Sequence, residues 1–315
     1  MNTKAVLSEN EKTELLKKCV TVKTGIRLKN RMRRVGFYRL FLYAKFLLSK
    51  SYLLTAKPSE DMLYNLYDFD EKLRVLLFVF CKKAEINLKA NISLVCTQSE
   101  ENNLFYALPQ SYTPSKSVND KLEKQKNVDY FKIYLKDLLQ EEKKIRTHNI
   151  SKHTELVMMR PKTKKSTDRL PADVLFSYLD LGSVCNMYAY LRGDLRKSIL
   201  KNSYTCKNYG KETTKQYDTW LDAIRNLRNC CAHHNILVGK TSNIILAQYG
   251  EEHLLSSATD LFSRLYALKK VLPQKDAQDL GTALEKLVLH GKTDVELLGI
   301  LPCNWKEKYD EIKFL

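Results

Sequence analysis

One window of the sequence, residues 223–237 (AIRNLRNCCAHHNIL), gathers two arginines, three asparagines and two adjacent histidines. The whole chain has six histidines, so a neighbouring pair beside two arginines stands out. Histidine can take up or release a proton near neutral pH, and a guanidinium stabilises the extra negative charge of a phosphorane. This set is suited to metal-independent RNA cleavage, in which histidine serves the 2′-hydroxyl or the leaving oxygen as base or acid.

Two other interpretations fit the same residues. Arginine and histidine often occur at helix ends as caps and as partners of the helix dipole, so the spacing alone also allows a purely structural helix end. A zinc site would use four neighbouring side chains, those of Cys230, Cys231, His233 and His234. It is disfavoured because adjacent ligands point to different faces of a helix. We therefore expect no metal and no cofactor.

A helical projection of residues 220–234 separates these side chains. One stripe is apolar and is expected to face the core: Trp220, Ile224, Leu227 and Cys231. The opposite face carries Asp222, Arg225, Asn226, Asn229 and His233. His233 is thereby free for chemistry. His234 falls on a flank, where we expect it to be half-buried and bonded to a carbonyl at the helix end.

Arg228 and His233 lie roughly 140° apart on an ideal helix, so they do not converge within a regular helix. They come together only if the helix loosens at its end, or if a second copy of the chain supplies the other half of the site. The candidate catalytic residues are Arg228, Asn229 and His233, with Arg225 and His234 in support.

Helical periodicity dominates the rest of the chain. In residues 67–94, Asp68 and Glu71 have the spacing of a capping box and precede an apolar stripe. The stripe comprises Leu73, Leu76, Leu77, Phe80, Ala84 and Leu88. Further segments are predicted as a loop (100–120), a helix (121–145), a basic connector (161–171), a single helix containing Gly182 (172–191), the motif helix from about residue 213, and two helices ending at Pro273 and Gly291.

The pattern predicts an all-α fold, because it contains no convincing strand, repeat or glycine-rich phosphate loop. We expect one α-helical domain over residues 1–315, with basic N-terminal helices (1–55), a core (about 60–240) with an insertion (about 97–165), and C-terminal helices (250–315). No apolar run reaches the roughly 18 residues of a membrane span, and the N-terminus lacks the apolar core of a signal peptide. We expect a cytoplasmic protein with reduced cysteines and no membrane partner.

The formal net charge of +17 predicts attraction to a polyanion, either nucleic acid or an anionic membrane surface. Eight basic residues and no acid occur between Lys17 and Arg34, and a second basic run follows at 160–169. A solvated surface is the alternative interpretation of any one of these cations. The candidate phosphate contacts are Arg27, Lys29, Arg31, Arg33, Arg34 and Arg39.

Tyr38 and Arg39 lie in the segment FYRLFLY and could stack on and grip single-stranded RNA. The alternative is an amphipathic core helix that turns Phe37, Leu40, Phe41 and Tyr43 inward, and this alternative is favoured for the aromatic side chains.

The segment RNCCAHHN, Arg228 to Asn235, resembles the RN-x-CAHH signature of the bacterial abortive-infection (Abi) family, part of the HEPN superfamily whose ribonucleases carry R-x4-6-H. Four other segments resemble that family in the expected order: 35–46, 67–92, 170–191 and 298–309. The second contains FD-x-x-LR, followed by an acid and a base of the conserved type, here Glu85 and Lys89. The resemblance spans about residues 25–310. Among the departures, Ser177 stands where the family has an acid.

The resemblance implies a HEPN-type helical bundle that forms a homodimer and brings two R-x4-H motifs into one composite site. It carries Arg228, Asn229 and His233 over as the motif residues, with His234 completing the double histidine. It also implies a toxin-like role, in which RNA cleavage arrests a phage-infected cell.

Three hypotheses follow from the sequence. The first is the ribonuclease toxin, with RNA as its substrate. The second is a non-catalytic module whose basic groove holds a small structured RNA, which could also restrain a toxin. The third is a dimerisation scaffold that acts on other proteins. Substitution of His233 by alanine separates the first two, because it should abolish cleavage and leave RNA affinity nearly unchanged.

Overall fold

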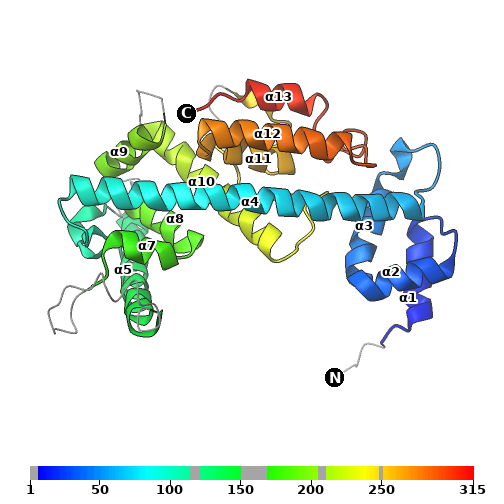
Figure 1. The fold of residues 1–315 in the computed structure, drawn as a ribbon, viewed down its shortest axis with the longest axis horizontal. Helices are drawn as coiled ribbons and strands as arrows, with labels where there is room; N and C mark the ends of the chain where they lie inside the picture. Colours follow the sequence, from blue (N-terminus) through cyan, green and yellow to red (C-terminus); the bar gives the residue numbers. More distant parts are fainter. Residues whose placement is uncertain (1–5, 114–120, 150–168, 205–210, 248–250) are drawn as a thin grey trace.

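The computed structural model describes residues 6–113, 121–149, 169–204, 211–247 and 251–315 (Figure 1). Within these ranges the chain is helical and contains no β-strand, which confirms the all-α prediction. Two isolated bridges, Thr21 with Ser59 and Tyr112 with Leu191, are the β-type pairings in the described part. Most of the predicted basic connector 161–171 lies outside the described residues.

One helix, α4 (Glu60–Ser99), has 40 residues and runs the length of the molecule (Figure 1). At 1.5 Å per residue it is about 60 Å long. Its apolar stripe is confirmed, because Leu73, Leu77, Phe80, Ala84 and Leu88 are buried and Leu76 is half-buried.

The predicted capping box at Asp68 is wrong. The helix begins eight residues earlier, where the Ser59 hydroxyl accepts a hydrogen bond from the Met62 N–H (3.2 Å). The residues between these positions extend the buried stripe, and the Asp68 side chain pairs with Arg31 instead of capping. A capping signal is local, and here the apolar face continues through it.

Three short helices pack at the N-terminal end of α4 (Figure 1). They are α1 (Glu9–Cys19), α2 (Gly25–Val35) and α3 (Phe37–Ser49), followed by the single turn η1 (Ser51–Leu53). In α3, Leu40 and Tyr43 are fully buried, whereas Tyr38 is 72% exposed. The prediction of an amphipathic core helix is therefore confirmed for the face that carries Leu40 and Tyr43, whereas Tyr38 lies at the surface.

A second group of helices surrounds the other end of α4 (Figure 1). It comprises α5 (Lys121–Lys144), η4 (Ile145–Asn149), α7 (Ala172–Tyr178), α8 (Leu181–Tyr190) and α9 (Gly193–Ser203), with the turns η2 (Phe105–Ala107) and η3 (Pro109–Ser111). The segment 100–113 is a loop as predicted, but it is anchored by the buried rings of Phe105, Tyr106 and Tyr112.

The single helix predicted over 172–191 is wrong, because the chain breaks it into α7 and α8. Asp180 adopts an extended conformation, and its carboxylate accepts a hydrogen bond from the Ser183 N–H (2.8 Å). A side-chain cap of this kind starts a new helix. Gly182 sits beside that cap, where a Cβ atom would approach Asp180 Oδ1 to 2.9 Å.

The remaining helices are α10 (Lys211–Ala232), η5 (Glu252–Leu254), α11 (Leu261–Val271), α12 (Gln274–Leu289) and α13 (Trp305–Glu311). Of these, α10, α11 and α12 pack against α4, and α13 packs against α12 and η5. Every residue of α11 is buried, since it lies against α10, α12 and α4. The predicted start of the motif helix and the predicted stops at Pro273 and Gly291 are confirmed. Among the described helices, none combines the length and the apolar character that a membrane crossing requires.

Candidate functional site at the end of α10

The last turns of α10 carry the residues that the sequence singled out. Its predicted apolar stripe is confirmed, because Trp220, Ile224, Leu227 and Cys231 are all buried. Asn229 and His233, predicted to face away from the core, are exposed. The packing of one face therefore presents the other face of the motif to solvent.

The backbone closes α10 in a defined way at the double histidine. The N–H of His234 donates to the carbonyl of Cys231 (3.2 Å), and the N–H of Asn235 donates to that of Cys230 (2.9 Å). His234 has a φ of 54°, in the left-handed region. These features define a Schellman motif, with His233 as the C-cap residue after Ala232 and His234 in the position that glycine usually occupies.

The prediction that His234 is half-buried is wrong, because its side chain is exposed. The helix end is made by the backbone of His234, which leaves the imidazole at the surface. His233 is exposed as well, and within the described ranges its side chain makes no hydrogen bond or ion pair. The backbone of His234 thus closes the helix, and the His233 imidazole is open to a ligand.

Arg228 on α10 forms an ion pair with a residue of the neighbouring helix α4. Its Nε lies 3.6 Å from Oε2 of Glu85 on α4, and the second oxygen of Glu85 accepts a hydrogen bond from Lys89 (2.7 Å). The Glu85 side chain is 10% exposed and that of Arg228 is 31% exposed. Arg228 also donates to Oδ1 of Asn229 (3.3 Å) and lies over the ring of Phe78. Glu85 thus holds the guanidinium while part of it stays accessible.

The other supporting positions lie around this pair. Arg225 is held on its own face by Asp222 (2.8 Å) and by the amide of Asn186 on α8 (3.3 Å). Ser177, where the resemblance predicted an acid, is exposed on α7, and its hydroxyl donates to the carbonyl of Asp173 (3.0 Å). The carboxylate beside Arg228 comes from Glu85 instead.

A fully buried carboxylate fixes the segment that follows the histidines. Oδ1 of Asp70 accepts hydrogen bonds from the N–H groups of Leu237 and Val238, both at 3.1 Å. Its Oδ2 accepts from the hydroxyl of Tyr43 on α3 and from the guanidinium of Arg74. Burial raises the pKa of the Asp70 carboxyl, and the charge of Arg74 opposes that shift.

Sequence reasoning missed this role of Asp70. The available signal was an aspartate and an arginine four residues apart within a stripe of buried apolar residues, where charged side chains occur only when paired. The Asp70 contacts join α3, α4 and the exit of α10, three segments that also carried the family resemblance.

A family model described as "Abi-like protein" matches residues 30–238. The chain belongs to the Abi-like family. The match begins within α2 and ends at Val238, so it contains the Asp70 contacts, the Glu85–Arg228 pair and both histidines. The predicted resemblance of residues 298–309 lies beyond it. No curated protein and no solved structure matches this chain. Membership of the family suggests a role in abortive infection of phage-attacked cells.

The buried thiol of Cys231 does not suit metal binding at the motif of this Abi-like protein. Burial raises the pKa of Cys231 to about 12 and that of Cys81 well above its usual value. These thiols therefore stay protonated at neutral pH, whereas a metal ligand or nucleophile needs the thiolate. In the described part of the chain, no group of three or more histidine, cysteine and acidic side chains is arranged to hold a metal ion.

The predicted phosphate contacts of the Abi-like protein largely have partners of their own. Arg27 pairs with Asp61 (2.7 Å), Arg31 pairs with Asp68, and Arg33 makes two hydrogen bonds to Glu9 (2.7 and 2.9 Å). Lys29 donates to the amide oxygen of Asn10 (2.8 Å). The basic segment 17–34 contains no acid, but in the folded chain acidic residues of α1 and α4 pair with its arginines.

Two of the predicted cations differ from the rest. Arg34 is exposed and Arg39 is half-buried, and within the described residues neither makes a hydrogen bond or an ion pair. These two guanidiniums are available to a phosphate without first breaking an internal contact.

Proposed function

We propose that this Abi-like protein is a HEPN-type endoribonuclease that cleaves RNA in phage defence through Arg228, Asn229 and His233. One observation carries the proposal: the exposed imidazole of His233, which has no partner among the described residues, lies at the end of α10, and Glu85 on α4 anchors the guanidinium of Arg228 in the same helix. A free acid–base group and a fixed cation are the two components that metal-independent phosphodiester cleavage requires.

In the proposed reaction the 2′-oxygen of a nucleotide attacks the adjacent phosphorus, and the bond from phosphorus to the 5′-oxygen breaks. The products are a 2′,3′-cyclic phosphate and a 5′-hydroxyl. His233 takes the proton of the 2′-hydroxyl or gives one to the departing 5′-oxygen. Arg228 stabilises the negative charge of the phosphorane. Asn229 accepts a hydrogen bond from Arg228 through its amide oxygen, so its NH2 group can face the phosphate.

A homodimer completes the proposed site. Arg228 and His233 diverge by roughly 140° on an ideal helix, so a second copy of the chain is proposed to pair its His233 with Arg228 of the first. By symmetry the dimer would contain two equivalent Arg228–His233 pairs, which together form one composite site.

The test is incubation of the purified protein with total cellular RNA in EDTA, followed by mapping of the ends. The wild type is expected to leave 2′,3′-cyclic phosphates, and His233→Ala is expected to lose the activity. His253→Ala is the matched control, because His253 is an exposed histidine of η5 whose Nε2 lies 3.7 Å from Glu311, outside the motif. Equal cleavage by the wild type and His233→Ala would refute the proposal.

A second candidate, the RNA-binding module, is favoured by the guanidiniums of Arg34 and Arg39, which have no partner in the described part of the chain, and by the net charge of +17. In that case a small structured RNA is bound and not cut. Tight RNA binding with no cleavage by any variant would select this candidate. RNA binding no tighter than that of other basic proteins, lost at moderate salt, would select the protein scaffold instead.

A further inference from the structure

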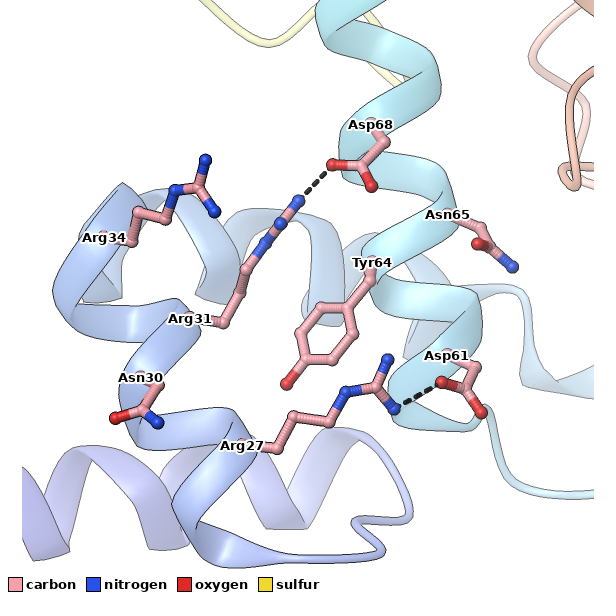
Figure 2. Close-up of a pocket in the computed structure, with 8 residues that line it drawn as sticks. All are labelled: Arg27, Asn30, Arg31, Arg34, Asp61, Tyr64, Asn65 and Asp68. Atoms are coloured by element: carbon pink, nitrogen blue, oxygen red, sulfur yellow. Dashed lines mark hydrogen bonds and ion pairs between the residues drawn. The ribbon is translucent and has the colours of Figure 1, made fainter.

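A pocket of about 330 Å³ lies between α2 and the first turns of α4 (Figure 2). Four residues of α2 and four of α4 line it: Arg27, Asn30, Arg31, Arg34, Asp61, Tyr64, Asn65 and Asp68. Its volume is at the low end of the roughly 300–1,000 Å³ of small-molecule sites, which leaves room for one nucleotide-sized group.

Acidic residues of α4 hold two of these arginines in place. Arg27 binds Asp61 and Arg31 binds Asp68, on either side of the Tyr64 ring (Figure 2). Their guanidinium carbons lie 4.9 and 5.5 Å from the centre of that ring. A guanidinium has five N–H donors, so these contacts fix its orientation and leave further donors for a ligand.

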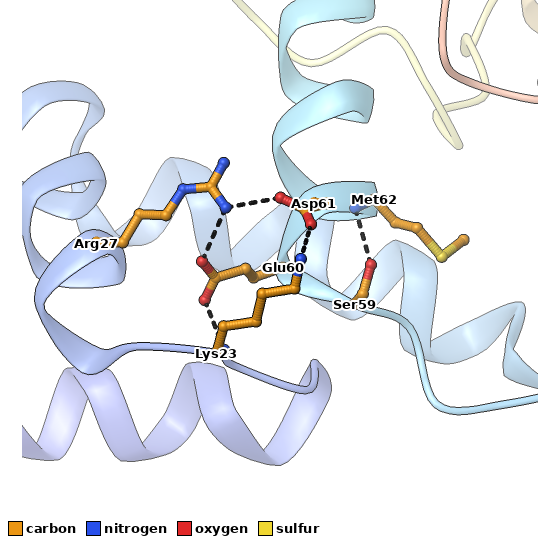
Figure 3. A network of polar contacts seen from close by, with 6 residues as sticks. All are labelled: Lys23, Arg27, Ser59, Glu60, Asp61 and Met62. Carbon is orange, nitrogen blue, oxygen red and sulfur yellow. Dashed lines mark hydrogen bonds and ion pairs between the residues drawn. The ribbon is translucent and has the colours of Figure 1, made fainter.

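The start of α4 fixes Arg27 further (Figure 3). Arg27 also donates a hydrogen bond to the fully buried Glu60 (3.3 Å). Asp61 forms a second ion pair, with Lys23 (2.6 Å). The N-terminus of α4 favours both carboxylates. The donors of this pocket are therefore organised before any ligand arrives.

Buried donors in the pocket wall have no acceptor. Within the described residues, the hydroxyl of Tyr64 and the Nε of Arg31 are buried without a hydrogen-bond partner. The Tyr64 side chain is 6% exposed, and burial raises its pKa to about 12, so the hydroxyl keeps its proton at neutral pH. Buried polar groups are normally satisfied, so the wall lacks an acceptor.

The charge of the pocket indicates what that acceptor is. Three guanidiniums face two carboxylates, which leaves one positive charge unbalanced. An anion with several oxygen acceptors would balance this charge and accept hydrogen bonds from the free donors of the pocket. We propose that this pocket is a binding site for a phosphate group, carried either by an RNA strand or by a mononucleotide.

This site is separate from the proposed nuclease site. Asp61 and Asp68 precede Glu85 on the same helix by a separation of roughly 25–35 Å along its axis. The inference goes beyond the proposed function and does not depend on it, because phosphate binding here requires neither Arg228 nor His233.

A neighbouring pocket bears on the source of the phosphate. It has a volume of about 280 Å³, shares Asn65 and Asp68 with the first, and is lined by Lys72, His290 and Lys292. An RNA strand with one phosphate among the α2 arginines could extend its next phosphates toward these cations. A mononucleotide would have no such contact.

The test is a binding measurement with two probes, fluorescein-labelled 2′-O-methyl hexauridylate and AMP. The modified RNA has no 2′-hydroxyl nucleophile, so binding is measured without cleavage. Arg34→Gln is expected to weaken binding about tenfold, the loss of one charge-assisted hydrogen bond. Tyr64→Phe is expected to weaken it about threefold. The matched control is Arg33→Gln, which removes the same charge one residue away but outside the pocket, and less than about a twofold change is expected.

The outcomes are distinct. Weaker AMP binding in Arg34→Gln, with Lys292→Gln unchanged, supports a mononucleotide site. Weaker RNA binding in both variants, with no AMP binding, supports an RNA strand. Equal effects of Arg33→Gln and Arg34→Gln, or no effect of Arg34→Gln and Tyr64→Phe on either probe, would overturn the proposal. His233→Ala should bind as the wild type does, so failure of the nuclease proposal would leave this result standing.

Discussion

Oε2 of Glu85 on α4 lies 3.6 Å from Nε of Arg228 on α10, and the same carboxylate binds Lys89 through its other oxygen. The pair joins the long central helix to the motif helix at the level of the proposed active site. Because Glu85 pairs with Arg228 and Lys89, we infer that it positions the guanidinium of Arg228 in the proposed site.

Glu85→Gln is expected to reduce RNA cleavage roughly 10- to 100-fold, because loss of the anchor lets the guanidinium move away from the phosphate. The loss should appear in kcat, with KM changed less than about twofold. Glu71→Gln is the control, since Glu71 is exposed on the same helix. A drop in affinity with unchanged kcat would contradict the positioning role.

Asp70→Asn is expected to lower the free energy of unfolding by about 3 kcal/mol, because it leaves the buried Arg74 without its counter-charge. Urea denaturation measures this loss, and amide hydrogen exchange at Leu237 and Val238 should become faster. Asp279→Asn, at an exposed position of α12, should change stability by less than about 0.5 kcal/mol. Unchanged exchange at Leu237 would show that Asp70 does not hold this segment.

His234→Gly is expected to raise the free energy of unfolding by about 1 kcal/mol, because glycine adopts the left-handed conformation of this helix end without strain. His234→Ala removes the same imidazole but keeps the strained Cβ, so it should bring no such gain. Thermal denaturation compares the two. If His234→Gly cleaves RNA like the wild type, the imidazole of His234 has no part in the chemistry.

A mixture of Arg228→Gln and His233→Ala chains is expected to regain part of the cleavage activity that each variant lacks alone. In the composite site of a mixed dimer, one of the two Arg228–His233 pairs combines an intact Arg228 with an intact His233. The measurement is the cleavage rate after co-refolding, against each variant treated in the same way. No recovery by mixed dimers that are shown to form would place both residues of the site in one chain.

Lys269 gives the fold a pH dependence. Burial lowers its pKa from 10.5 to about 8, while its ammonium donates to the carbonyl of Tyr309 (2.5 Å). Between pH 8 and 10.5 the unfolded chain binds more protons at this residue than the folded chain, so Lys269 makes stability rise with pH in that window. Urea midpoints of the wild type should rise relative to those of Lys269→Met over this range. A constant difference between the two proteins would exclude this effect.

The sequence by itself determined the features that depend on local spacing. The buried stripe of α10, the exposed Asn229 and His233, and the ends of α11 and α12 follow from helical periodicity and from proline and glycine stops. The motif in residues 228–235, together with four further segments in the expected order, indicated the family that the match over 30–238 then established. Local capping signals were less reliable, since α4 continues through Asp68 and the predicted helix over 172–191 breaks at Asp180.

Only the tertiary structure decided which distant groups meet. The hydrogen bond from Leu237 to Asp70 spans 167 residues, and the acids that neutralise Arg27 and Arg31 lie on a different helix from the basic run. No periodicity records such a pairing, because it depends on how helices cross and on the need to satisfy charges that packing has buried. For the same reason, the sequence identified Arg228 as a candidate, but only the fold placed Glu85 beside it.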